Sequence, residues 1–160
     1  MKTYEIVSKV SVYTMNELPE ADRQLVEAAM EATATSYAPY SLFKVGAAAR
    51  LANGTVCRGS NQENASYPLA LCAERTCLFA ANANHPDQPV VALAIAARNA
   101  QNEFLTQPIP PCGACRQVIL EVEDRYKQPI RILLYGTEGV HVVDTIKALL
   151  PLQFVADNMK

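Results

Sequence analysis

Two nearly continuous apolar runs constrain the fold of this 160-residue sequence more than any other feature. Val90 to Ala97 and Ile130 to Tyr135 contain almost no polar residues, which is the pattern of strands covered on both faces. A sheet covered on both faces needs a layer of helices on each side. The runs therefore predict an α/β protein, a three-layer α/β/α sandwich around a mixed sheet.

Periodicity and turn residues predict the other elements. Apolar residues at helical spacing and helix-start signals such as Pro19 predict three long helices, over about 19–35, 72–83 and 113–126. Asn53-Gly54 accepts positive φ at both positions and predicts a two-residue hairpin, and Pro151 should end a short last helix. The predicted strands are Tyr4 to Tyr13, Phe43 to Leu51, Thr55 to Ser60, the two apolar runs, and a last hairpin around Gly136 to Gly139.

We expect a single domain over residues 1–160, with a mixed five-stranded sheet and an additional N-terminal strand. That strand lies in an N-terminal extension, residues 1–18. The length of 160 residues is close to that of one ordinary domain, and half of the residues are hydrophobic. The chain is therefore expected to bury a substantial core.

Charge and hydropathy exclude several classes of partner. The formal net charge is -2, and no basic cluster suited to neutralising many phosphates is present, which argues against nucleic-acid binding. No apolar run is long enough to span a membrane, and the first residues lack the apolar core of a secretory signal. These features predict a cytoplasmic protein without nucleic-acid or membrane partners. The five cysteines are then expected to be metal ligands or ordinary thiols.

A pair of cysteines at a predicted helix start is the first sign of a metal site. Cys112 and Cys115 are separated by two residues and follow Pro111. This spacing brings two thiolates within reach of one ion, and the free N–H groups of a helix start stabilise them. Taken alone, the pair also fits a redox motif or two buried thiols.

A third cysteine precedes a carboxylate by two positions at the start of the other helix. Cys72 and Glu74 stand in an otherwise apolar segment, where a buried carboxylate is costly unless it has a partner or a chemical role. An ion pair with Arg75 is the alternative interpretation of Glu74. Arg75 is also the nearest cation that could offset the negative charge of three thiolates, and Arg116 is a weaker candidate.

The other potential ligands fit the site less well. Cys77 lies five residues after Cys72, about 140° around a helix, and so faces away. Cys57, His85 and His141 stand alone, without a neighbour at ligand spacing. Three protein ligands leave a fourth tetrahedral position for water, which is the pattern of a catalytic zinc site.

The combination of these residues matches the zinc deaminase signature, and the chain resembles the cytidine deaminases, in particular their short, three-cysteine, homotetrameric branch. The resemblance runs from about Ser36 to Phe154. It is carried by the segments Tyr37-Ala38-Pro39-Tyr40-Ser41, Phe43 to Ala48, Asn61 to Pro68, Cys72-Ala73-Glu74-Arg75, Pro111 to Gln117 and Leu149-Leu150-Pro151.

The resemblance implies a function and a set of roles. It implies hydrolytic deamination of cytidine and deoxycytidine, with one Zn²⁺ per subunit and Glu74 as the proton shuttle. It also implies a homotetramer whose active sites are shared between subunits. The implied zinc ligands are Cys72, Cys112 and Cys115, with Arg75 as the charge-compensating group. The resemblance also implies substrate contacts: Asn61 and Glu63 to the ribose 3′-hydroxyl, Phe43 and a neighbouring subunit's Phe154 to the base, and Tyr67 near a subunit boundary.

Three alternatives stay open from the sequence. A structural zinc module would need a fourth protein ligand, and a redox C-x-x-C protein would leave Cys72 and Glu74 without a role. A deaminase of another aminopyrimidine would keep the metal motif but not need the ribose residues. Gln62 stands where the resembling enzymes lead us to expect an apolar residue, and residues 1–18 extend beyond the family's usual start.

Overall fold

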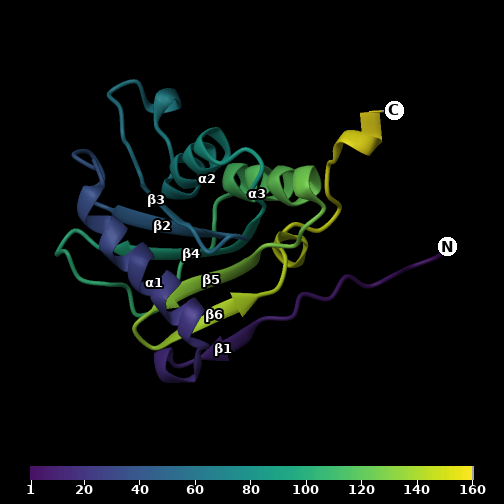
Figure 1. The fold of residues 1–160 in the computed structure, drawn as a ribbon, viewed down its shortest axis with the longest axis horizontal. Coiled ribbons are helices and arrows are strands. Elements are labelled where there is room, and N and C mark those ends of the chain that lie inside the picture. The colour runs from purple at the N-terminus through teal and green to yellow at the C-terminus, as the bar shows by residue number, and fades with distance from the viewer. Residues whose placement is uncertain (160) are drawn as a thin grey trace.

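Helices cover both faces of a single mixed sheet in the computed structural model, which describes residues 1–159 (Figure 1). The order of strands across the sheet is β1-β6-β5-β4-β2-β3. The strands are β1 (Ser11–Tyr13), β2 (Lys44–Leu51), β3 (Val56–Ser60), β4 (Val90–Arg98), β5 (Arg131–Gly136) and β6 (Gly139–Val143), and the long helices are α1 (Glu20–Ala32), α2 (Ala73–Asn84) and α3 (Gly113–Tyr126).

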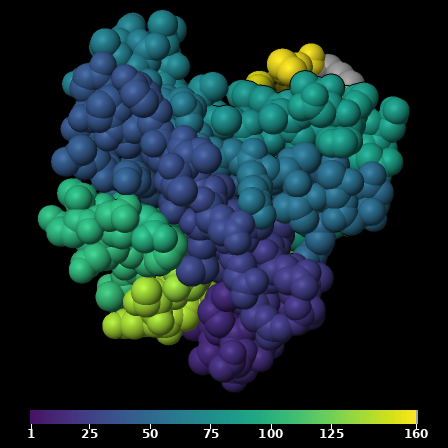
Figure 2. Space-filling view, turned by 60° about the vertical axis from the view of Figure 1, so that its left-hand side comes forward, coloured from purple at the N-terminus to yellow at the C-terminus, as the bar shows by residue number. Residues whose placement is uncertain are grey.

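The expected three-layer sandwich is confirmed, with α1 on one face and α2 and α3 on the other. Side chains of β4 alternate between two cores: Leu93 and Ile95 pack with α2 and α3, whereas Ala92, Ala94 and Ala96 pack with α1. Alanines on the second face let α1 lie close to the sheet. Figure 2 shows α1 and the residues after it running across the front of the molecule, from the purple N-terminal end to the upper left.

The strand pairing shows that the sheet is mixed. Strands β4 and β5 are parallel, and the other four pairs are antiparallel. A parallel pair needs a crossover, which the chain makes through α3. The sheet has six strands rather than five because β1 pairs with β6 and extends it.

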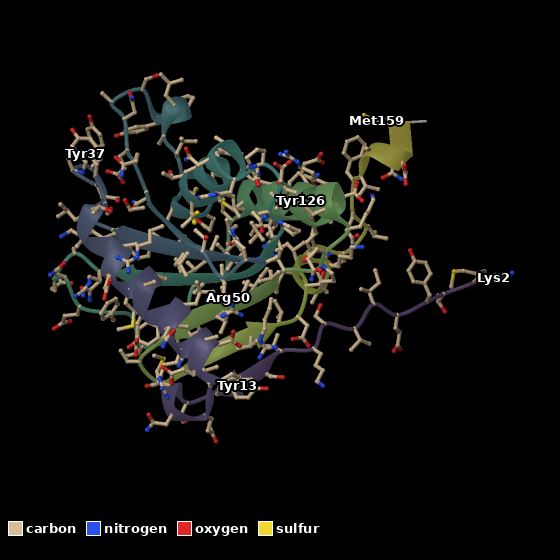
Figure 3. All side chains as sticks on the ribbon, viewed as in Figure 1. Lys2, Tyr13, Tyr37, Arg50, Tyr126 and Met159 are labelled. Carbon is tan, nitrogen blue, oxygen red and sulfur yellow. The ribbon has the colours of Figure 1, made fainter. Side chains whose placement is uncertain are left out.

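The predicted N-terminal strand is too long. Only Ser11–Tyr13 pair with β6, in register with Val140 to Val142, and residues 1–10 are extended, exposed and outside the sheet. The reason is that β6 is short, so the alternating residues before Ser11 have no strand beside them. Figure 3 shows this arm leading away from the body to Lys2.

Two smaller expectations also need correction. Four residues, 52–55, separate β2 from β3, and the turn is closed by hydrogen bonds from Leu51 N to Thr55 O and from Gly54 N to Leu51 O. Gly54 alone takes a positive φ, of 87°, while the Asn53 side chain accepts a hydrogen bond from Thr55 N. The short helix predicted before Pro151 is a 3₁₀ segment over Ile146–Leu149, and a further 3₁₀ segment follows at Ala156–Met159.

A buried carboxylate joins α1 to the sheet. Asp22 is 4% exposed and forms ion pairs of 2.9 Å with Arg50 on β2 and with Arg131 on β5. Each of its two oxygens has a different arginine as partner. Arg50 lies near the middle of the sheet in Figure 3, so this contact links one layer of the sandwich to the next.

Candidate metal centre and active site

Three cysteine sulfurs from two helix starts form one cluster. Cys72 and Cys112 are the N-cap residues of α2 and α3, and Cys115 lies in the first turn of α3. The Sγ atom of Cys112 lies 3.8 Å from that of Cys72 and 3.5 Å from that of Cys115. All three sulfurs lie within 4.8 Å of one another. The sequence prediction of a three-cysteine group is confirmed.

The cluster fits a zinc ion. With Zn–S bonds of about 2.3 Å in a tetrahedron, neighbouring sulfurs stand about 3.8 Å apart, close to the two separations of 3.8 and 3.5 Å. Cys115 is buried, Cys72 half-buried and Cys112 exposed. Among residues 1–159, no other histidine, cysteine or carboxylate joins the group, so Cys57, Cys77, His85 and His141 are not ligands within it.

The helix starts and Arg75 favour negative charge on Cys72. The pKa of Cys72 falls to about 5, chiefly because the Cys115 thiol hydrogen-bonds to it, with a further hydrogen bond from Arg75. The pKa of Cys115 is raised because it keeps the shared proton and is buried. Arg75 Nη2 lies 3.6 Å from Cys72 Sγ. The thiolate is the form of cysteine that binds metals.

Glu74 lies beside the cluster in a nearly dry environment. The residue is 5% exposed, and burial raises the pKa of its carboxyl group. Among the described residues, no ion pair joins Glu74 to Arg75. The Arg75 guanidinium instead contacts Cys72 Sγ and Ala70 O. A carboxyl group whose pKa is raised keeps its proton to a higher pH than an exposed one, which suits a group that must both take up and give back a proton.

A cavity of about 470 Å³ opens beside the cysteine cluster, within the usual range for small-molecule sites. Among residues 1–159, Arg75 is the only cation in its wall, and two carboxylates, Glu63 and Glu74, also line it. Most of the remaining wall is apolar. Its lining includes Ser41, Phe43, Asn61, Glu63, Tyr67, Leu71, Cys72, Glu74, Arg75, Ile109 and Cys112.

Asn61 and Glu63 are held by the segment before β2 and by the start of β2 itself. Asn61 Oδ1 accepts hydrogen bonds from Val45 N and Ser36 Oγ, and its Nδ2 donates to Phe43 O at 2.9 Å. One N–H of the Asn61 amide is thus left for a ligand. Gln62, between them, points the other way and donates to Thr35 O and Ser60 Oγ. That polar contact accounts for its departure from the expected apolar residue.

The structure brings most predicted site residues to this cavity, but not Phe154. Phe43 and Tyr67 line it, whereas Phe154 is 58% exposed and outside its lining in the same chain. Arg116, the weaker candidate for charge compensation, contacts two backbone carbonyls. Its guanidinium donates to Pro111 O at 2.8 Å and to Leu149 O at 2.6 Å, so it ties the start of α3 to the C-terminal tail.

Comparisons with known proteins agree with the fold and the cluster. The family described as the cytidine and deoxycytidylate deaminase zinc-binding region matches residues 19–127. A cytidine deaminase of Halalkalibacterium halodurans is 42% identical over 139 residues, which are 86% of this chain and 98% of that protein. A cytidine deaminase of Sporosarcina psychrophila is 35% identical, over 85% of this chain and 93% of that protein.

Solved structures give the same relationship. The structure of cytidine deaminase from Burkholderia pseudomallei is 44% identical with a TM-score of 0.69, covering 82% of this chain and 97% of that chain. The enzyme from Mycobacterium leprae is 35% identical with a TM-score of 0.63, over 84% and 99% of the two chains. The fold and site define a zinc-binding deaminase domain. The chain belongs to the cytidine and deoxycytidylate deaminase family.

Proposed function

We propose that this chain catalyses the zinc-dependent hydrolytic deamination of cytidine and deoxycytidine to uridine and deoxyuridine, with release of ammonia. The observation that carries the proposal is the buried Glu74 carboxyl in the wall of a cavity that also contains Cys72 and Cys112. A structural zinc module has no need for such a cavity. We place the reaction in pyrimidine salvage in the cytoplasm. Among residues 1–159, no helix is long and apolar enough to cross a membrane.

The residues of the chain divide the chemistry among them. Cys72, Cys112 and Cys115 would hold one zinc ion, which supplies Lewis acidity toward a water molecule. Glu74 takes a proton from the attacking water and delivers it to the cytosine ring nitrogen. It then takes the second proton, from the hydroxyl added to the ring carbon, and gives it to the departing amine as the C–N bond breaks. Burial of its carboxyl keeps bulk water from competing for that proton. Arg75 offsets the negative charge of Cys72.

The polar groups facing the cavity select a nucleoside with a free hydroxyl. Asn61 has one N–H to donate, and Glu63 has carboxylate oxygens that accept, so one sugar hydroxyl can accept from the first and donate to the second. A phosphate in the same place would meet the Glu63 carboxylate and offer it no hydrogen. Phe43 and Tyr67 supply apolar surface for the base. We therefore propose a free nucleoside as the substrate, and not a polynucleotide.

Assembly is the second part of the proposal. Phe154 lies outside the cavity of its own chain. Other apolar side chains are exposed as well, among them Tyr67 in the cavity wall, Leu69 close to it in sequence and Phe79 on α2, at 71%, 68% and 48%. Apolar surface of this kind is typical of an interface. We propose a homotetramer in which Phe154 of one subunit completes the base-binding site of another.

A single assay tests the proposed reaction. Loss of the cytosine absorbance on incubation with cytidine, abolished by zinc chelation and restored by zinc, is the expected result. No ammonia from cytidine, with stoichiometric zinc bound, would support the structural zinc module instead. Deamination of another aminopyrimidine, with no activity on cytidine, would contradict the assignment of cytidine as the substrate. Efficient deamination of a single-stranded oligonucleotide would contradict the free-nucleoside proposal.

Sedimentation and one variant test the shared site. Phe154→Ala should weaken cytidine binding by about 1–2 kcal/mol, the value of one lost base-aromatic stack, and leave the zinc content unchanged. Leu152→Ala is the matched control, because Leu152 is another exposed apolar residue of the tail. A fully active monomer at micromolar concentration would contradict the shared site.

A further inference from the structure

The segment of residues 36–43 is hydrogen-bonded at several points to Asn61 and Glu63, the two residues proposed to bind the sugar. Tyr37 N donates to Asn61 O at 3.0 Å, and Glu63 N donates to Tyr37 O at 2.8 Å. Those two contacts use backbone atoms only, and they place the segment along the strand-like stretch 61–63. The segment then delivers Phe43 to the start of β2.

Ser41 occupies the point where this segment meets the Glu63 side chain. Its hydroxyl donates to Glu63 Oε1 and accepts a hydrogen bond of 3.0 Å from Phe43 N. The other carboxylate oxygen, Oε2, accepts from Tyr40 N at 2.9 Å and from Ser41 N at 3.3 Å. One hydroxyl thus contacts both the carboxylate that faces the sugar and the backbone of the aromatic residue that faces the base.

The backbone is bent specifically at this point. Leu42, between Ser41 and Phe43, takes a φ of 57°, which is uncommon for a residue with a side chain and costs free energy. Its side chain is 54% exposed, so burial of Leu42 does not explain the conformation. The bend is instead what allows the Ser41 hydroxyl to reach forward to Phe43 N while it contacts Glu63.

The Ser41 hydroxyl also affects the charge of the carboxylate. The pKa of Glu63 is lowered, chiefly by the hydrogen bond from Ser41. An ionised carboxylate accepts hydrogen bonds only, so a sugar hydroxyl that contacts Glu63 must be the donor. One oxygen of Glu63 is occupied by two backbone N–H groups, which leaves Oε1, the oxygen that Ser41 orients, to meet the ligand.

We propose that Ser41 is a positioning residue that sets Glu63 and Phe43 together and thereby makes the site select nucleosides with a free 3′-hydroxyl. The inference rests on the proposed deamination of nucleosides and assigns a determinant of their specificity. Ser41 acts through Glu63, so its contribution should depend on the sugar hydroxyl that Glu63 binds. A residue that only supported the loop would affect all nucleosides alike.

The test compares cytidine with 2′,3′-dideoxycytidine, which lacks the 3′-hydroxyl. Ser41→Ala should raise KM for cytidine about tenfold, the order of one charge-assisted hydrogen bond, with little change in kcat. For dideoxycytidine its KM should stay within about twofold of the starting protein. Ser41→Thr keeps the hydroxyl and should restore the cytidine KM, and Ser41→Cys, a weaker donor, should be intermediate and covers the case in which the alanine variant is unstable.

A double-mutant cycle separates the two roles further. In a Glu63→Ala background, Ser41→Ala should raise the cytidine KM by less than about twofold, because the group through which it acts is gone. Equal losses for cytidine and dideoxycytidine, or additive losses in the cycle, would overturn the positioning role while leaving deamination intact. Absence of deamination in the unmutated, zinc-loaded protein would instead contradict the proposed function itself.

Discussion

A side chain at Gly59 would collide with the backbone of Cys77, because an added Cβ would lie 2.4 Å from Cys77 N. Strand β3 and helix α2 therefore touch through their backbones, without side chains between them. Cys72 and Glu74 belong to the first turn of that helix. The spacing of β3 and α2 thus sets the height of the metal ligand and of the proton-carrying carboxyl above the sheet.

Gly59→Ala is expected to lower the free energy of unfolding by about 1–3 kcal/mol, as overpacking of a dense core does. It should also weaken zinc binding, since α2 must move. Gly113→Ala is the matched control: a Cβ there meets nothing within 4 Å, so stability and zinc content should hold. Thermal unfolding and metal analysis of both variants check this, and equal stability of the two would contradict the close contact.

The two roles assigned to the site predict two different failures. Glu74→Ala should retain stoichiometric zinc and lose at least about 10²–10⁴-fold in kcat, the usual contribution of a general acid–base. Cys112→Ala should lose zinc together with soluble folded protein, because the ion joins the starts of α2 and α3. Metal analysis with single-turnover kinetics separates them. Substantial turnover by Glu74→Ala would contradict the shuttle.

The thiol of Cys77 should be inert in the folded protein. Burial raises the pKa of Cys77 to about 12, so at pH 8 only about one thiol in ten thousand is ionised, and the thiolate is the reactive form. Reactivity should rise only as the pH approaches that value or as the protein unfolds. Mass spectrometry after iodoacetamide treatment measures it, with exposed Cys112 of the chelated protein as the control. Early labelling of Cys77 would contradict its burial.

Asp22 predicts a large and local stability effect. Asp22→Asn should lower the free energy of unfolding by about 3–5 kcal/mol, because it leaves the partly buried Arg50 and Arg131 without their shared anion. Asp144 also pairs with Arg131, but its side chain is 80% exposed, so Asp144→Asn should cost less than about 1 kcal/mol. Denaturant unfolding compares the two variants, and similar losses would mean that burial does not matter here.

The metal cluster could be predicted from the sequence because each of its cysteines stands at a predicted helix start. Two N-caps and one first-turn position put Cys72, Cys112 and Cys115 at helix starts, and the parallel β4 and β5 pattern brings those helices to one face. Leu93 and Ile95 alternate with small alanines in β4, so the burial of that strand on both faces could also be predicted from the sequence. Cys77 faced away from the site, as its angular position implied.

Non-local pairing and hydrogen bonds from side chains to the loop backbone account for what the sequence did not show. The alternation from Tyr4 to Val10 is the pattern of a strand, but β6 is too short to pair with it. Asn53 lacks positive φ because its side chain bonds to Thr55 N and stabilises a longer loop. The role proposed for Ser41 depends on Glu63, 22 positions away. It also depends on a positive φ at Leu42 that no propensity of leucine predicts.

The contact between Arg116 and Leu149 spans 33 positions along the chain, and this has a consequence for the order of folding. During synthesis the N-terminal part of a chain emerges first, so all three cysteines are made before the carbonyl that holds the neighbouring arginine. The zinc ligands can therefore gather while the start of α3 is still free to adjust. The tail fastens that helix only later, as one of the last steps in building the domain.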